Sequence, residues 1–126
     1  MRLLVSLLVI FAVAVSLGFW TNHKLAVSTG DLLENIEKIE AGIENNQWET
    51  ARSHTMDLEE TWDKKASWWP TVMDHQEIDN IEFAMAKVKE YIGNQNAALS
   101  WGQLSELKLM IKHIPEKEAV TIKNIL

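Results

Sequence analysis

The chain has 126 residues, a formal net charge of −6 and no cysteine. This length allows one small domain with one core beside an anchor, and is too short for two domains. The acidic balance excludes a nucleic-acid binder, which needs a basic face, and the lack of cysteine excludes disulfides and thiolate metal sites.

An uninterrupted run of apolar and small residues extends from Leu3 to Trp20, with Arg2 as the single cation before it. At a rise of 1.5 Å per residue such a helix is roughly 27 Å long, just enough to cross a bilayer. Trp20 then lies where an amphipathic indole meets the lipid headgroups. We therefore predict a membrane anchor over residues 1–22 that contacts the lipid bilayer through Leu3 to Trp20.

A cleaved secretory signal is the competing interpretation, because Ser16 and Gly18 are small residues of the kind found near cleavage sites. Phe19 and Trp20 continue the apolar run beyond them, which favours an uncut anchor. The two-residue tail before the run has nothing to fold and is expected to stay cytoplasmic. This predicts a single-pass protein of the cell membrane with its C-terminal domain extracytoplasmic.

The part after Trp20 is acidic, with 11 Lys and Arg against 18 Asp and Glu, a balance of −7. We expect it to begin with a linker over residues 23–30, in which Ser28, Thr29 and Gly30 mark the start of a helix. The first helix of the domain then runs from Asp31 to the Asn45 and Asn46 pair. Its apolar positions follow a helical period: Leu32, Leu33, Ile36, Ile39 and Ile43.

Three further helices are predicted from the same periodicity. The second begins at Trp48 and ends at Pro70, the third begins at the N-cap Asp74 and ends at Gly93, and the fourth runs from Ala97 to Pro115. Residues 115–126 form a tail with a final apolar turn.

The two halves of this domain match each other at an offset of 49 residues, which aligns Ile43 with Ile92 and Asn45 with Asn94. Each half is a helix, an Asn- and Gln-rich turn and a second helix. The predicted fold is all-α: an N-terminal transmembrane helix followed by a four-helix bundle or two stacked αα-hairpins. The domain covers residues 31–126, with hairpins over 31–69 and 74–114 and the tail over 115–126.

Two stretches give the chain a family resemblance: His75 to Glu82, and Leu107 to Leu126. The second is distinctive from His113 onward, beginning with His113-Ile114-Pro115-Glu116-Lys117-Glu118. They resemble the uncharacterised bacterial domain-of-unknown-function family 4363. The resemblance implies a small protein with an N-terminal membrane segment and an α-helical remainder. It implies no activity and no catalytic residues.

His75, Asp79 and Glu82 lie three and four residues apart on the third helix, a spacing that offers imidazole and carboxylates to a divalent metal. We favour the competing interpretation, in which Asp74, Glu77 and Asp79 stabilise the N-terminus of the helix, whose dipole is positive there. The sequence contains no zinc-protease motif and no phosphate-binding loop, so neither an enzyme nor a cofactor is expected.

Trp68 and Trp69 are adjacent at the predicted end of the second helix. Neighbouring residues point about 100° apart on a helix, so one indole is expected to be partly exposed. Exposed tryptophan is typical of binding hot spots. The sequence therefore predicts a non-enzymatic interaction module that binds a protein partner through Trp68, Trp69, His75, Glu77 and Asp79, with no role for nucleic acid.

Two other functions remain open. One is a metal or small-ligand sensor that uses the region of His75 and Asp79. The other is a structural protein that self-associates through its helices or its membrane segment, where Ala12, Ser16 and Gly18 are small.

Overall fold

The computed structural model describes the backbone over residues 1–65, 68–71 and 73–125. It describes side chains over the same residues apart from 21, 22, 71 and 115–125. The elements, in chain order, are α1 (Arg2–Glu44), α2 (Trp48–Lys65), the single 3-10 turn η1 (Trp69–Thr71), α3 (His75–Gly93) and α4 (Ala97–Ile125).

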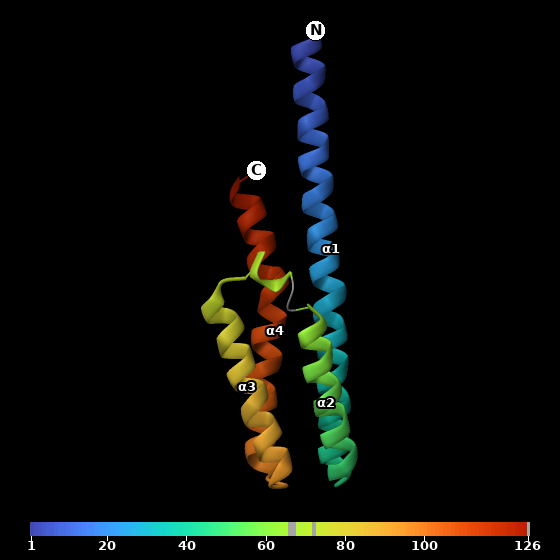
Figure 1. Ribbon diagram of the computed structural model, residues 1–126, viewed down its shortest axis with the longest axis vertical. Helices are drawn as coiled ribbons and strands as arrows, with labels where there is room; N and C mark the ends of the chain where they lie inside the picture. The colour runs from blue at the N-terminus through green and yellow to red at the C-terminus, as the bar shows by residue number, and fades with distance from the viewer. Residues whose placement is uncertain (66–67, 72, 126) are drawn as a thin grey trace.

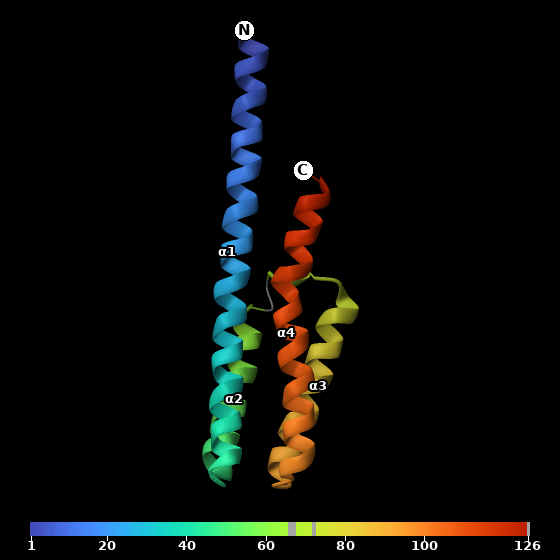
Figure 2. The ribbon, with the colours of Figure 1, turned by 180° about the vertical axis from the view of Figure 1, so that it is seen from behind.

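The helices run alternately in opposite directions and form a four-helix bundle (Figures 1 and 2). α1 packs on α2 and α4, and α3 packs on α4 and α2. The part of the chain that the structure describes contains no strand. The all-α prediction is thus confirmed, with the bundle as its arrangement.

α1 is longer than the other helices and extends well beyond the bundle at its N-terminal end (Figure 1). Among the described residues it is the one helix that is long and apolar enough to cross a membrane, judged by length and composition. Its most apolar 18-residue window has no buried residues. The apolar part of α1 therefore stands apart from the protein core.

The expected linker over residues 23–30 is instead part of α1. Leu25 is completely buried, and Ser28 and Thr29 are almost completely buried. The Thr29 hydroxyl donates to the Ala26 carbonyl at 3.1 Å, so it is satisfied inside a helix and has no need to cap one. Packing against the bundle begins at Leu25, six residues earlier than the sequence indicated.

Two other predicted helix ends are also wrong. α2 ends at Lys65, and Trp69 and Pro70 belong to η1. α4 continues past Pro115 to Ile125, so the expected tail is the last part of this helix. A proline inside a helix removes one hydrogen bond, and the helix formers around it, Glu116 to Ala119, allow the helix to continue.

The core is built from the predicted apolar positions of all four helices. The members with no more than 2% exposure include, from α1 to α4, Leu32, Ile36, Ile39, Ala51, Leu58, Trp62, Ile81, Val88, Ile92, Leu104, Leu107 and Ile111. On each helix they are three, four or seven residues apart, as one buried stripe requires. The periodicity of the sequence thus located the core correctly.

The two hairpin turns have the same hydrogen bonds at an offset of 49 residues. Asn45 N–H donates to Ala41 O and Asn94 N–H to Glu90 O, both at 3.0 Å. Asn46 and Gln95 follow, with positive φ angles of 57° and 53°. Because the bonding pattern repeats with the same offset as the apolar residues, the bundle consists of two equivalent αα-hairpins.

Candidate functional site

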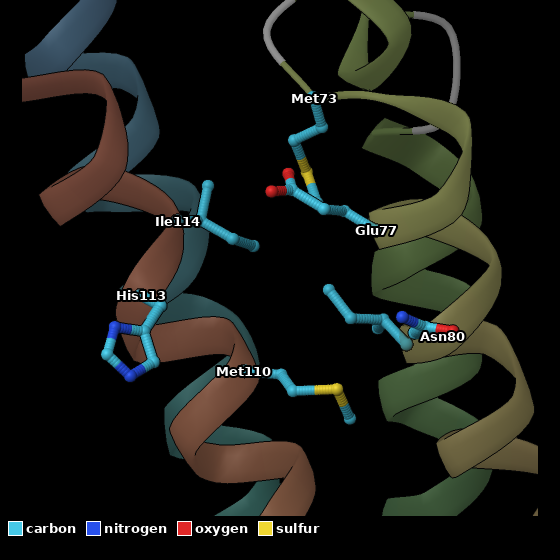
Figure 3. A pocket seen from close by; sticks show the side chains of 7 residues that line it. Met73, Glu77, Asn80, Met110, His113 and Ile114 are labelled. Atoms are coloured by element: carbon cyan, nitrogen blue, oxygen red, sulfur yellow. The ribbon is translucent and has the colours of Figure 1, made fainter. Parts of the chain in front are cut away.

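A pocket opens between α3 and α4 near η1, with a volume of about 220 Å³ (Figure 3). Its described lining residues come from the two helices and from the segment that leads into α3: Met73, Glu77, Asn80, Ile81, Met110, His113 and Ile114. Most of the lining is apolar, since four of these seven side chains are methionine or isoleucine.

The pocket has a buried apolar floor and a polar rim. Met73, Ile81 and Ile114 are buried in the core, and Met110 packs against it. In Figure 3 the Glu77 side chain reaches from α3 toward Ile114, and the Met110 thioether points toward α3. Methionine is flexible and polarizable, so this wall can adapt to apolar groups of different shape.

The first turn of α3 positions the rim. Asp74 is the predicted N-cap, and its carboxylate accepts the backbone N–H of Glu77 at 2.8 Å. The cap fixes the start of the helix, so Glu77 lies at the mouth of the pocket and Ile81, one turn later, lies on its floor. The N-cap prediction is confirmed.

Two exposed apolar side chains lie beside the pocket. Phe83 of α3 is 63% exposed and Leu109 of α4 is 58% exposed. Phe83 follows Asn80 by three residues and Leu109 precedes His113 by four, so each lies about one turn farther from η1 than a lining residue, on the outward side of its helix; neither lines the pocket itself. We call the pocket together with Phe83 and Leu109 the α3/α4 surface.

An aromatic stack lies at the same end of the bundle, where α1 leaves it. Trp69 stacks on Trp62 and Trp68 with ring centroids 5.2 and 4.7 Å apart. The Lys24 ammonium lies 4.7 Å from the Trp68 ring centroid and 5.3 Å from that of Trp20. Lys24 therefore connects the end of the apolar segment to the tryptophans of the bundle through two cation–π contacts.

The structure separates the two tryptophans predicted to form a binding surface. Trp69 is 1% exposed, and Trp68 is half-buried against it and under Lys24. Trp68 thus covers the end of the bundle and Trp69 belongs to the core, because the chain turns at η1 and directs Trp69 inward. The prediction of a surface centred on both indoles does not fit this geometry.

The predicted residues of α3 lie on different faces. Glu77 lines the pocket, whereas His75 and Asp79 are exposed and do not line it. Glu82 accepts a hydrogen bond from Trp62 Nε1 at 3.1 Å and so serves the α2–α3 packing. Over the described residues, no three histidine, cysteine, aspartate or glutamate side chains, His75, Asp79 and Glu82 included, are grouped so as to hold a metal ion.

The sequence analysis missed Met73, Met110, His113, Phe83 and Leu109. A signal was present for two of them: Phe83 and Leu109 are large apolar residues outside the buried stripes of their helices. Apolar side chains on the outward face of an amphipathic helix indicate a contact surface when they gather in one place. The pocket itself depends on how α3 and α4 approach each other.

The fold and the site define a small helical-bundle protein with an apolar N-terminal helix and an open apolar pocket. The chain belongs to the family described as Domain of unknown function (DUF4363), whose model matches residues 19–125. The match covers the whole bundle and begins where the apolar run ends. No curated protein and no solved structure matches the chain.

Proposed function

We propose that this is a single-pass membrane protein whose helical domain lies outside the cytoplasm and binds another protein without catalysing a reaction. The observation that carries the proposal is the α3/α4 surface, an open, mostly apolar pocket with two exposed apolar side chains on the outward faces of the same two helices. Contiguous exposed apolar surface on a small domain is typical of protein contact sites.

The position of the anchor supports membrane attachment. The apolar segment of α1 is exposed over its length, which is unfavourable in water and favourable in lipid. Residues 21–37 contain one lysine and no arginine, so this flank carries no basic cluster that would hold it in the cytoplasm. Trp20 and Lys24 lie at this boundary, where amphipathic side chains are favoured.

The chemistry of the pocket supports recognition. Its described lining includes one carboxylate and one imidazole, and no serine, threonine or cysteine that would act as a nucleophile. A volume of about 220 Å³ is below the range of roughly 300–1,000 Å³ usual for small-molecule sites. The pocket is suited to one or two apolar side chains of a partner.

The proposal is tested by crosslinking the full-length protein in intact cells. Met110→Arg places a charge in the pocket wall and should abolish partner capture. Met56→Arg is the matched control, because Met56 is 61% exposed on α2 and lies away from the pocket. Equal capture by both variants would refute the α3/α4 surface as the binding site.

The location is tested separately with a single cysteine. The chain has none, so Glu49→Cys at the end of the bundle far from the anchor gives one reactive thiol. An impermeant maleimide should label it in intact cells, and labelling only after lysis would place the domain in the cytoplasm.

Self-association is a second candidate, favoured by one observation in the anchor. Val9, Ala12, Val13, Ser16, Leu17 and Trp20 line a shallow open hollow of about 450 Å³ on one face of α1. Small residues at such a face allow close helix approach in a bilayer. Ser16→Cys should then form a disulfide dimer in membranes, whereas Ala14→Cys, on another face, should not.

A further inference from the structure

The end of the bundle next to the apolar segment of α1 carries two indoles that share one cation. Lys24 is four residues past Trp20, so the two side chains lie on the same face of α1. The Lys24 ammonium lies 5.3 Å from the Trp20 ring centroid and 4.7 Å from that of Trp68. Trp68 is therefore held close to the level at which the apolar run ends.

That level corresponds to the headgroup layer of a bilayer. This layer is roughly 5–8 Å thick on each side, because a bilayer of about 40–45 Å has a hydrocarbon core of about 30 Å. Lys24 is roughly 6 Å past Trp20 along the helix axis, at 1.5 Å per residue. With Trp20 at the edge of the hydrocarbon, the Lys24 ammonium and the Trp68 ring lie within the headgroup layer.

The continuity of α1 holds the bundle at this distance. α1 is one helix from Arg2 to Glu44, and the bundle already packs against it at Leu25, which is completely buried. A flexible linker would let the domain move away from the surface, whereas a helix fixes the distance along its axis. The bundle therefore begins directly beside the end of the apolar run.

The backbone of α4 reaches the same level. Lys108 of α4 pairs with Glu40 of α1 at 2.6 Å, so equal steps along these antiparallel helices bring Ile125 to the level of His23. Figures 1 and 2 show this part of α4 running past η1 in the direction of the apolar segment. The end of the bundle is therefore broader than α1 alone at the height of Lys24.

The chemistry of this end fits a headgroup layer. Tryptophan is favoured there because its ring is apolar and its N–H is polar. A cation–π contact is stronger where water is partly excluded, and Lys24 makes two such contacts. Its ammonium also complements the phosphate groups of phospholipids.

We propose that the end of the bundle formed by Lys24, Trp68 and η1 is seated in the phospholipid headgroup layer of the membrane that holds α1. Trp68 is then a second interfacial tryptophan beside Trp20. This inference rests on the membrane attachment in the proposed function and adds the orientation of the domain. The bundle stands end-on, with the α1–α2 and α3–α4 turns farthest from the bilayer (Figure 1).

The test places a photoreactive benzoylphenylalanine in the full-length protein in its own membrane, in place of Trp68. Trp48 is the matched control position, because it is also partly buried against the core but begins α2 at the other end of the bundle. The same probe in place of Trp20 reports the anchor itself. Mass spectrometry should find a phospholipid adduct at positions 68 and 20 and none at position 48.

A second measurement leaves Trp68 in place. The Trp20→Phe variant is reconstituted into phosphatidylcholine vesicles in which some headgroups carry a nitroxide, a short-range quencher of tryptophan emission. Part of the emission should be lost, because Trp68 lies among the headgroups. Adding Trp101→Phe, near the start of α4 at the far end of the bundle, should leave the amount of quenched emission unchanged.

A phospholipid adduct at position 20 without one at position 68 would overturn the inference and leave the anchor in place. So would a protein adduct at position 68 in place of lipid, a phospholipid adduct at position 48, or unquenched emission of Trp20→Phe. The absence of a phospholipid adduct at position 20 would instead refute the membrane attachment in the proposed function.

Discussion

The close approach of α1 and α2 depends on Gly42, and replacing it gives a sensitive test of the packing. A Cβ added at Gly42 would lie 3.0 Å from Ala51 N, 3.1 Å from its Cα and 3.2 Å from its Cβ. Two of these atoms are backbone, so the relief must come from a shift of α2 as a whole. We therefore expect Gly42→Ala to be destabilising despite the better helix propensity of alanine.

The magnitude follows from two opposing effects. Alanine stabilises a helix interior by about 1 kcal/mol relative to glycine. Overpacking at a tight contact costs about 1–3 kcal/mol. The expected net loss in the free energy of unfolding is about 1 kcal/mol, which for a domain of this size lowers the melting temperature by roughly 4–8 °C.

Gly102→Ala is the matched control. Gly102 is an exposed position inside α4, where an added Cβ would have no neighbour within 4 Å. Only the propensity effect applies there, so this variant should gain about 1 kcal/mol. The same chemical change is thus predicted to have opposite signs at two helical sites.

The assay is thermal unfolding of the full-length protein in detergent, followed by near-ultraviolet circular dichroism. The stacked Trp62, Trp68 and Trp69 report the folding of the bundle, whereas far-ultraviolet signals also include the apolar part of α1 outside the bundle. If Gly42→Ala raises the melting temperature as Gly102→Ala does, the α1–α2 contact is looser than described and the reasoning is refuted.

Three further predictions address other contacts of the bundle. Trp62→Phe removes the hydrogen bond to Glu82 and leaves a gap in the core, so it should lower the free energy of unfolding by about 2–3 kcal/mol in chemical denaturation. Glu82→Gln keeps an acceptor oxygen for the indole and should cost less. A loss as large as that of Trp62→Phe would contradict the role given to the core gap. Lys24→Met removes the cation–π contacts and should lower the free energy of unfolding by about 0.5–1 kcal/mol, whereas Lys24→Arg should stay close to wild type in the same assay. Equal losses in the two variants would argue against a role for the positive charge. Glu40 and Lys108 form a partly buried charge pair and not a well-aligned hydrogen bond. A double-mutant cycle with Glu40→Gln and Lys108→Met should give a coupling free energy of about 1 kcal/mol. If the losses of the two single variants simply add, the pair contributes nothing to stability and this prediction is wrong.

The repeated hairpin and its turns follow from local sequence alone. Both helices end because Asn46 and Gln95 have positive φ and the next N–H groups, of Gln47 and Asn96, donate to Gly42 O and Tyr91 O at 2.7 and 2.9 Å. Such bonds involve only neighbours in the chain, so residue type and spacing are sufficient to predict them. The N-cap Asp74 is predictable for the same reason.

The candidate site was only partly predictable. Glu77 was identified because it stands in the first turn of a helix, and it lies at the pocket mouth. The choice between Trp68 and Trp69 depended on tertiary contacts: Trp69 stacks on Trp62 of α2, and Trp68 lies under Lys24 of α1. No local pattern states which of two adjacent indoles the neighbouring helices will cover.

The sequence by itself determined the all-α class, the apolar N-terminal segment, the buried stripes and the turns, because each arises from composition, periodicity or bonds between near neighbours. The tertiary structure decided the continuity of α1 through residues 23–30, the burial of Trp69 and the pocket between α3 and α4. These features depend on contacts between residues distant in the chain: Leu25 belongs to the bundle because other helices pack around it, and the pocket exists because α3 and α4 diverge near Met73 and Ile114. Packing free energy outweighs local preference in such places, and a local pattern does not record it.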